Sequence, residues 1–505
     1  MQRYCYALIP AVAFFFWGAA HAADGPKALV IVIDGLRPDY VREDLMPNLH
    51  ALGEDGVVCT NHHAVFPTVT RVNSTTFSTG CYPARHGILS NGIYVPAVDK
   101  QKGFSTGSAE NLMKLDAATG GKVVTAPTLG EILDSAGMKI FVASSGSSGS
   151  SFLLNPRAKG GGIVNSELVL PESARAHVDE LLGPVPEEAV PNAAASRRIV
   201  DGLIRIGIDE HRAEMMFLWI TDPDHTAHVR GIGTPDTLAA LKHVDEEVGR
   251  VLAELNAKGL QDRTNIFITS DHGFSTQKGM GGISQLLVQQ GVKKSLASTD
   301  VILADGAIYV DNHDESKVRA IVDVLQATEW VGAVFTPAAA PGDVKGRVAG
   351  TFSFDSIYWN HERVGDILVD ANWSEASNEL GWKGTTMLQG MAGHGTSSPY
   401  DIYNTLIAAG PAFKRGITSD VPTGNVDIAP TVLHVLGVKN TPGMDGRVLI
   451  EILSDGPDPK SVSVTRATES TENATGTIVY RATMHRSTVD GHTYLDYTRV
   501  TREKK

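Results

Sequence analysis

The amino-acid sequence predicts an α/β/α sandwich around a mainly parallel β-sheet, and two observations carry that prediction. Short unbroken apolar runs alternate with amphipathic helical patterns along most of the 505 residues, which is the order of βαβ units. Several apolar runs end at or just before an Asp, and open α/β sheets hold their ligands at the carboxyl ends of their strands. A hydrophobic content of 42% is ample for a large core, as one domain with insertions or as two domains.

The first predicted strand covers residues 28–34, whose Val and Ile content is typical of a strand buried on both faces. Further strands are expected at residues 139–143, 214–221, 265–270 and 405–409. Helices are expected where apolar residues recur at helical spacing, at residues 46–56, 127–137, 235–255 and 426–436. Because the two kinds of element alternate, the sheet should carry helices on both faces.

Residues 93–125 and 275–392 break this alternation, since both regions are long, rich in glycine and mixed in pattern. The second has a strand-like run at 306–310 and a helical pattern at 315–325, which predicts an inserted cap subdomain over residues 275–392. The catalytic domain is then expected to comprise residues 23–274 and 393–505. Near the C-terminus, residues 477–499 alternate as strands do, around an Asp490-Gly491 hairpin turn.

Residues 1–22 have the pattern of a secretory signal peptide. Arg3 supplies the positive start, an apolar stretch follows, and Ala20-His21-Ala22 fits the small-residue cleavage pattern. The alternative is an uncleaved membrane anchor, although the apolar run is short for a bilayer span of about 20 residues. We therefore expect a periplasmic or secreted protein without a membrane association after cleavage.

The charge and the cysteines narrow the classes of partner. The formal net charge is −13, and loss of Arg3 with the signal peptide makes the mature chain one unit more negative. Such a balance disfavours binding to a nucleic-acid backbone. Cys59 and Cys81 are the cysteines left after cleavage, and export would allow a bridge between them, which the sequence leaves open. The sequence does not indicate an oligomeric state.

Six side chains at or just beyond the ends of predicted strands form a candidate metal-binding set. Three are Asp and three are His, an oxygen and nitrogen set that suits Zn²⁺. Two such ions close together can activate a hydroxyl and stabilise the leaving oxygen of an in-line displacement. An Asp at a strand end is often only a helix cap, and scattered histidines such as His62 and His225 have ordinary structural roles. The six candidates are Asp34, Asp224, His228, Asp271, His272 and His394.

The segment of residues 66–92 supplies a candidate nucleophile, Thr70, in a turn before a Ser/Thr-rich helix start. What distinguishes this chain is the joint order of its motifs. An Asp-Gly pair is followed by P-T-x-T with TGxYPxxHG, then PDxxxH, then DHG, then GHG. Chance agreement of all five motifs in this order is small.

Taken together, these motifs resemble the alkaline phosphatase superfamily, and within it the type I phosphodiesterase/nucleotide pyrophosphatase branch, over roughly residues 28–440. The resemblance implies an alkaline-phosphatase-like fold and hydrolysis of a small phosphodiester or pyrophosphate. It implies one Zn²⁺ held by Asp224, His228 and His394, and a second Zn²⁺ held by Asp34, Asp271 and His272. It further implies Thr70 as the bridging nucleophile and Asn91 as a donor to a phosphoryl oxygen.

The chain departs from the animal-type pattern next to Thr70. There the nucleophile is followed by Phe-Pro-Asn, whereas here Arg71-Val72-Asn73 follows, which puts a nucleoside-stacking pocket of that kind in doubt. Arg71 is long enough to contact a substrate phosphate, and its alternative role is a surface salt bridge. Monoesterase relatives carry a Lys-x-Arg pair in a loop that aligns loosely with Asn155-Pro156-Arg157. Arg157 and Lys159 are therefore candidates for phosphate binding.

Three rival functions remain. One is a phosphomonoesterase or phosphonate hydrolase on the same site, and another is a non-catalytic binding protein that kept the fold. The third is a sulfatase, because Cys81, Pro83 and Arg85 satisfy the CxPxR core that sulfatases convert to formylglycine. Against the sulfatase, that nucleophile should stand where Thr70 is, and Cys81 belongs to the later TGxYPxxHG element.

Overall fold

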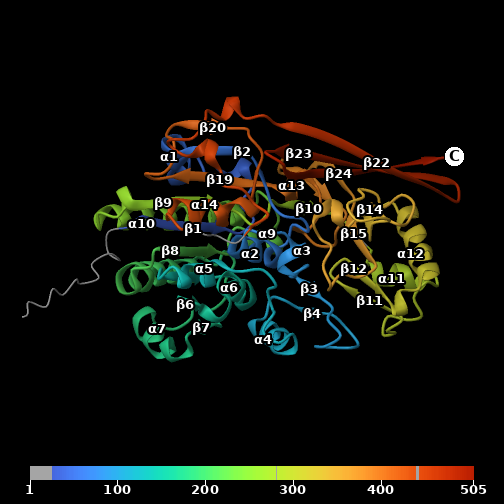
Figure 1. Cartoon of the computed structure of the whole chain (residues 1–505), viewed down its shortest axis with the longest axis horizontal. Helices are drawn as coiled ribbons and strands as arrows, with labels where there is room; N and C mark the ends of the chain where they lie inside the picture. The colour runs from blue at the N-terminus through green and yellow to red at the C-terminus, as the bar shows by residue number, and fades with distance from the viewer. Residues whose placement is uncertain (1–24, 280, 440–442) are drawn as a thin grey trace, which may run out of the picture.

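The computed structural model describes residues 25–279, 281–439 and 443–505, and its largest sheet has ten strands (Figure 1). The strands β20-β2-β19-β9-β1-β8-β5-β6-β7 follow one another across it, and β21 pairs with β2. The central strand β1 runs parallel to both β8 and β9, and β5 runs parallel to β8 and β6. The mainly parallel sheet predicted from the sequence is therefore confirmed. The bounds are β1 Lys27–Ile33, β2 Val57–His63, β5 Ile140–Ser144, β6 Gly161–Asn165, β7 Val169–Leu170, β8 Met215–Ile220, β9 Thr264–Thr269, β19 Tyr403–Ala409, β20 Ile417–Ser419 and β21 Thr423–Gly424.

Side chains of β1 alternate between two apolar cores, one on each face of the sheet. Val30 and Val32 contribute to one core, and Leu29, Ile31 and Ile33 to the other. The first core also receives α2, α5, α6 and α14, and the second receives α1, α8 and α10. Burial on both faces explains why β1 is apolar without interruption. The helices are α1 Pro47–Asp55, α2 Thr70–Thr79, α5 Leu129–Ser135, α6 Ser148–Leu154, α8 Ala193–Gly202, α10 Pro235–Ala257 and α14 Ile428–Val435.

The predicted helices and strands of this layered core all form, with ends within two residues of those expected. Local signals account for several of the boundaries. Thr128 and Glu131 form a capping box at the start of α5, and Thr234 caps α10 just before Pro235. One strand was not anticipated: β2 (Val57–His63) has polar, partly exposed positions and no clean apolar run. The orientation of β19 was not anticipated either, because it runs antiparallel between β9 and β2.

Residues 275–392 form two smaller sheets beside the main one (Figure 1). The predicted strand and helix of this segment are confirmed as β12 and α12. The sheet that contains β12 has the order β11-β12-β15-β13-β14, and the other has the order β16-β17-β10-β18. The exact limits of a cap subdomain stay a prediction. The bounds are β10 Ser275–Gln277, β11 Val301–Ala304, β12 Ala307–Val310, β13 Val331–Thr336, β14 Phe352–Ser353, β15 Ile367–Ala371, β16 Trp373–Ser377, β17 Lys383–Thr386, β18 Ala392–Gly393, α11 Ile283–Gln289 and α12 Glu315–Ala327.

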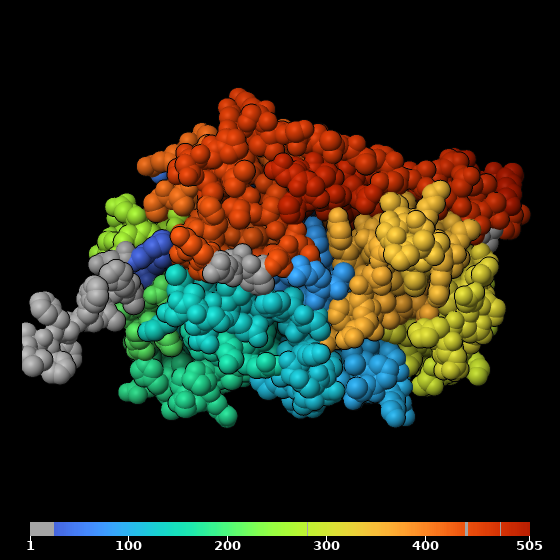
Figure 2. Space-filling model, viewed as in Figure 1, coloured from blue at the N-terminus to red at the C-terminus, as the bar shows by residue number. Residues whose placement is uncertain are grey.

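Three long C-terminal strands lie against this segment, and the space-filling view shows the two forming one continuous surface (Figure 2). They are β22 Thr465–Thr475, β23 Ile478–Val489 and β24 His492–Lys504, so the predicted hairpin is confirmed. Tyr480 donates its hydroxyl hydrogen to the Gly332 carbonyl, 3.0 Å away, and Arg502 donates to the Val331 carbonyl at 2.7 Å. The remaining elements are α3 Pro83–His86, β3 Gly92–Ile93, β4 Phe104–Ser105, α4 Ala109–Ala118, α7 Arg175–Leu182, α9 Asp224–Arg230 and α13 Pro399–Ile402.

The predicted signal peptide and the possible disulfide bond can be compared with the structure in turn. The predicted signal peptide, residues 1–22, lies outside the described residues. Throughout the part of the chain that is described, no helix has both the length and the apolar character needed to cross a membrane. Cys59 and Cys81 are both free and buried, so the bridge left open by the sequence does not form.

Candidate active site

The six predicted ligands meet at one edge of the main sheet. Asp34 directly follows β1, Asp224 begins α9 just after β8, and Asp271 lies two residues beyond β9. Because β1 pairs in parallel with both neighbours, the three strands deliver their carboxylates to adjacent positions. The loop after β18 brings His394 to the same edge from much later in the chain.

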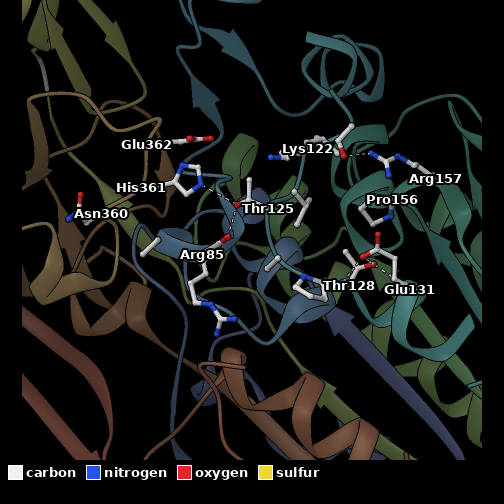
Figure 3. Close-up of a pocket in the computed structure, with 16 residues that line it drawn as sticks. Arg85, Lys122, Thr125, Thr128, Glu131, Pro156, Arg157, Asn360, His361 and Glu362 are labelled. Atoms are coloured by element: carbon white, nitrogen blue, oxygen red, sulfur yellow. Dashed lines mark hydrogen bonds between the residues drawn. The ribbon is translucent and has the colours of Figure 1, made fainter. Parts of the chain in front are cut away.

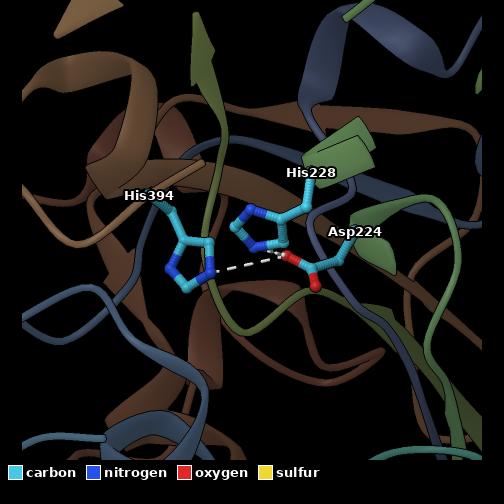
Figure 4. A group of neighbouring side chains, drawn as sticks. All are labelled: Asp224, His228 and His394. Atoms are coloured by element: carbon cyan, nitrogen blue, oxygen red, sulfur yellow. Dashed lines mark ion pairs between the residues drawn. The ribbon is translucent and has the colours of Figure 1, made fainter. Parts of the chain in front are cut away.

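One group consists of Asp224, His228 and His394, drawn in Figure 4. The four-residue spacing of Asp224 and His228 on α9 places both on one helix face, as the sequence predicted. Oδ2 of Asp224 lies 3.2 Å from Nε2 of His228 and 3.4 Å from Nε2 of His394. One ligand atom from each of the three residues lies within 4.8 Å of the others, so the group could hold a metal ion.

The second group consists of Asp34, Asp271 and His272, and all three are buried. Nε2 of His272 lies 3.0 Å from Oδ2 of Asp271 and 3.5 Å from Oδ1 of Asp34. The two groups adjoin, because the rings of His272 and His394 stack with their centroids 3.4 Å apart. The structure thus divides the six residues into the same two sets that the resemblance implied.

Each histidine is oriented by a backbone carbonyl on its other ring nitrogen. Nδ1 of His228 lies 2.9 Å from the Ala392 carbonyl oxygen, and Nδ1 of His394 lies 2.8 Å from that of Thr68. Nδ1 of His272 lies 2.9 Å from the Gly273 carbonyl oxygen. With Nδ1–H donating to a carbonyl, Nε2 carries the free lone pair toward the carboxylates. A histidine that binds a metal through one ring nitrogen typically donates a hydrogen bond from the other in this way.

Each carboxylate keeps one buried oxygen without a hydrogen-bond partner: Oδ1 of Asp34, Oδ2 of Asp224 and Oδ2 of Asp271. The other oxygen of Asp34 accepts a hydrogen bond from Trp219 Nε1 at 3.0 Å. Burial, followed by the nearby charges of Asp271 and Asp224, holds the pKa of Asp34 well above its ordinary value. Buried unpaired carboxylate oxygens are costly unless a cation meets them, so these donors fit divalent metal ions.

Thr70 is the first residue of α2, and its Oγ1 lies 3.5 Å from Nε2 of His272. The preceding Val69 is extended and its side chain makes no capping bond. Most of α2 is buried although it is rich in Ser and Thr, because its hydroxyls bond to nearby backbone carbonyls. For example, Ser78 Oγ donates to the Leu153 carbonyl of α6 at 2.7 Å. The threonine hydroxyl is therefore held on a rigid, buried helix beside one candidate metal group.

Asn91 and Arg71 flank Thr70. The Asn91 side-chain oxygen accepts from the Arg71 backbone N–H at 3.1 Å, which leaves the Asn91 amide hydrogens free of partners among the described residues. The Arg71 side chain has no hydrogen bond or ion pair within that part of the chain, and its buried Nε is unpartnered. Burial lowers the pKa of Arg71, while the nearby charges of Asp34 and Asp305 act to raise it. A surface salt bridge, the alternative role for Arg71, is thus not formed.

Comparison with known proteins decides the family. The family model "Type I phosphodiesterase / nucleotide pyrophosphatase" matches residues 28–394, well over half of the chain. The chain belongs to this family. Its members among the matches are enzymes named for phosphodiester or pyrophosphate hydrolysis, and the protein is accordingly a phosphoric ester hydrolase.

Individual relatives of this type I phosphodiesterase/nucleotide pyrophosphatase are distant. The bis(5'-adenosyl)-triphosphatase ENPP4 of Bos taurus is 23% identical over 431 residues, which cover 84% of this chain and 81% of the relative. Ectonucleotide pyrophosphatase/phosphodiesterase family member 1 of Mus musculus is 26% identical over 55% of this chain and 28% of its own length. Among solved structures, an inactive variant of murine ectonucleotide pyrophosphatase/phosphodiesterase 5 with AMP has a TM-score of 0.61. The structural match covers 85% of this chain and 100% of the murine chain, at 20% sequence identity. It supports the alkaline-phosphatase-like fold.

In this family member, Arg157 and Lys159 lie apart from the six predicted ligands. Arg157 pairs with Asp116, with 2.6 Å between Nη2 and Oδ1, and it lines a separate cavity of about 980 Å³ (Figure 3). None of the six ligands lines that cavity. Lys159 is exposed. The loop that does follow β5 toward the site, residues 145–147, and the helix α6 after it contain Ser, Gly, Phe and Leu but no cation.

Two polar residues that the sequence did not single out connect the loops of the candidate site. The carboxylate of Asp401 accepts from the Thr396 backbone N–H at 3.0 Å and from the Ser275 hydroxyl, which ties the DHG and GHG segments together. Asp305, between β11 and β12, accepts from the Asn91 backbone N–H at 3.0 Å and from the Ser90 hydroxyl at 2.6 Å. Neither residue lies in a recognisable motif, so no sequence signal could have identified it.

Cys81 lies outside both metal groups, with its thiol 3.4 Å from the Thr79 carbonyl oxygen. Burial raises the pKa of this thiol to about 11, which makes it a poor nucleophile at neutral pH. We expect Cys81→Ala to keep most of the activity and to lower the free energy of unfolding by about 1 kcal/mol, since no disulfide is lost. Turnover and urea denaturation measure the two effects. A dead Cys81→Ala variant together with formylglycine at position 81 by mass spectrometry would instead establish a sulfatase.

Proposed function

We propose that this family member is an exported two-zinc hydrolase that cleaves phosphodiester or pyrophosphate bonds through a phospho-threonine at Thr70. The observation that carries the proposal is the placement of the Thr70 hydroxyl beside His272, where two adjoining Asp/His groups present three unpartnered carboxylate oxygens. Export is supported by Arg3, the apolar stretch after it and Ala20-His21-Ala22.

The residues assigned to the two zinc ions follow from the two groups. Asp224, His228 and His394 would hold one ion, and Asp34, Asp271 and His272 would hold the other, beside the Thr70 hydroxyl. Bound zinc supplies positive charge that lowers the pKa of a nearby hydroxyl and offsets negative charge on the phosphoryl oxygens. The solved relative supports the nucleophile, because its inactive form is described as a threonine-to-alanine variant.

The chain's own residues account for the two displacement steps. Thr70 Oγ1 gives up its proton to solvent and attacks phosphorus in line. The Thr70 O–P bond forms as the bond to the leaving alcohol breaks, and the leaving oxygen takes up a proton from solvent. A water molecule then attacks the phospho-threonine, releasing the phosphate product and restoring the Thr70 hydroxyl. The free amide hydrogens of Asn91, which its bond with the Arg71 N–H holds at the start of α2, can donate to the phosphoryl oxygens during both steps.

Among the described residues, Arg71 supplies a cation next to Thr70 that could bind a substrate phosphate. A monoester dianion carries an extra charge, so a specialised site needs added cations near its non-bridging oxygens. Relatives that prefer monoesters use a Lys-x-Arg pair, but the loop after β5 has no cation here. A single half-buried guanidinium suits the single charge of a diester, and this favours diesters.

We therefore expect methyl 4-nitrophenyl phosphate to be hydrolysed with a higher kcat/KM than 4-nitrophenyl phosphate by the zinc-loaded protein. Arg71→Ala should lower kcat/KM for the diester by roughly 10- to 100-fold, because it removes a charged hydrogen bond to the phosphate. Lys159→Ala is the matched control, since Lys159 is exposed and should leave both rates unchanged. A monoester rate at least tenfold above the diester rate, lost in Arg71→Ala, would make the protein a phosphomonoesterase on the same site.

A further inference from the structure

A cavity of about 350 Å³ opens beside the candidate active site, between the main domain and residues 275–392. Val69, Ser90 and His394 line it on the active-site side. Residues 275–392 contribute the turn at Asp305, Trp330 and Leu388 to the lining. His394 belongs to one of the two predicted metal groups, so the cavity adjoins the site without containing it.

The geometry of the proposed reaction directs the leaving group of the substrate toward this cavity. This inference rests on the proposed function. In an in-line displacement the leaving oxygen departs on the side of phosphorus opposite to the nucleophile. Thr70 lies against His272, in the group with Asp34 and Asp271. The leaving group therefore points toward the other group, and His394 is the member of that group that lines the cavity.

The lining has an apolar wall and an acidic rim. Trp330, Leu368, Met387 and Leu388 supply apolar surface, which suits a flat or aliphatic group. Asp305 is exposed, and one of its carboxylate oxygens has no hydrogen-bond partner among the described residues.

The described side chains that line the cavity include no positive charge, although Arg71, outside the lining, is near enough to Asp305 for their charges to interact. The Asp370 carboxyl group lies deeper, where burial raises its pKa to about 7, and it accepts from the Ser397 backbone N–H at 3.2 Å. None of the described residues that line the cavity is a lysine or an arginine. The distal part of a leaving group that bears phosphate would therefore meet the Asp305 carboxylate, with no lysine or arginine in the described lining to offset the repulsion.

We propose that this cavity binds the leaving alcohol of a phosphodiester and selects one that is largely apolar and carries no negative charge. Pyrophosphate bonds, whose leaving group is itself an anionic phosphate, are then poor substrates. The natural substrate class is a diester of a neutral or cationic alcohol. The charge of the lining sets this preference, while Thr70 and the two metal groups set the chemistry.

The test uses two leaving groups of the same shape and different charge on the zinc-loaded protein. Methyl phosphodiesters of 4-nitrophenol carrying either a ring carboxamide or a ring carboxylate are compared by kcat/KM, each divided by its uncatalysed rate. The carboxamide ester is expected to react at least tenfold faster. Leu388→Lys places a cation in the wall and should reduce the ratio of the carboxamide to the carboxylate kcat/KM at least tenfold. Leu388→Gln, the uncharged control, should leave this ratio unchanged.

Equal rates for the two esters, or a ratio that Leu388→Lys does not change, would overturn the proposal. Failure of the proposed function gives a different pattern, since neither ester would then be hydrolysed. In that case calorimetric titration of the two free nitrophenols tests, independently of catalysis, whether the cavity prefers the uncharged phenol. Tighter binding of the carboxamide phenol that is lost in Trp330→Ala supports the assignment, and equal binding of both phenols contradicts it.

Discussion

Thr70→Ala should lower kcat for a phosphodiester by at least about 10³-fold while the fold and the metal content stay nearly unchanged. The substitution removes the proposed nucleophilic oxygen, which approaches His272 Nε2 at 3.5 Å. It should cost little stability, because Thr70 is not the cap of α2 and alanine is a good helix former. Turnover, elemental analysis and thermal unfolding measure the three properties.

A threonine in the same helix provides the control for this variant. Thr75 is also buried in α2, and its Oγ1 donates to the Arg71 carbonyl at 2.7 Å. Thr75→Ala should lose about 1 kcal/mol of stability and keep the phospho-threonine chemistry. Acid quenching followed by mass spectrometry should find phosphate on Thr70 in Thr75→Ala and in the natural chain. A Thr70→Ala variant that keeps more than a tenth of the activity would contradict the assignment of the nucleophile.

Removal of metal should abolish activity, and two equivalents of zinc per chain should restore it. The physical reason is that Asp34, Asp224 and Asp271 each keep a buried oxygen that no protein donor meets. Without cations, the three negative charges repel one another in a site of low dielectric, so the metal-free protein should also unfold at a lower temperature. Elemental analysis during dialysis against a chelator, with activity and melting temperature measured in parallel, checks both effects.

Histidine variants locate the two ions. His394→Ala should lose one zinc ion and most of the activity, since His394 belongs to the group of Asp224 and His228. His225→Ala is the matched control, because His225 neighbours Asp224 in sequence but lies outside both metal groups. The control should keep both ions. Full activity in chelator, with no stoichiometric metal in the protein, would rule out the two-zinc site.

The layered core and the ends of its strands could be predicted from the sequence because they depend on local patterns. The apolar run of β1 is buried on both faces, and its length places Asp34 at the edge of the sheet. The spacing of Asp224 and His228 matches one helical turn, and Asp271-His272 follows a strand of the same kind. These residues could therefore be grouped before any contact between them was known.

Tertiary structure alone decided the partners of side chains that pair over long separations. Arg157 was a candidate for phosphate binding, yet it pairs with Asp116 in another cavity, because folding brings α4 beside it. Arg71, with the same charge, is half-buried near the carboxylates of the site and makes no ion pair within the described residues.

Tertiary structure also decided the partners of Asp305 and the state of the two cysteines. The cysteines stay apart as free thiols, and Asp305 reaches Asn91 across more than two hundred residues of chain. Local periodicity determines which segments form strands and helices and where they end. The electrostatic role of an individual charge depends on neighbours that only the packing of distant segments supplies.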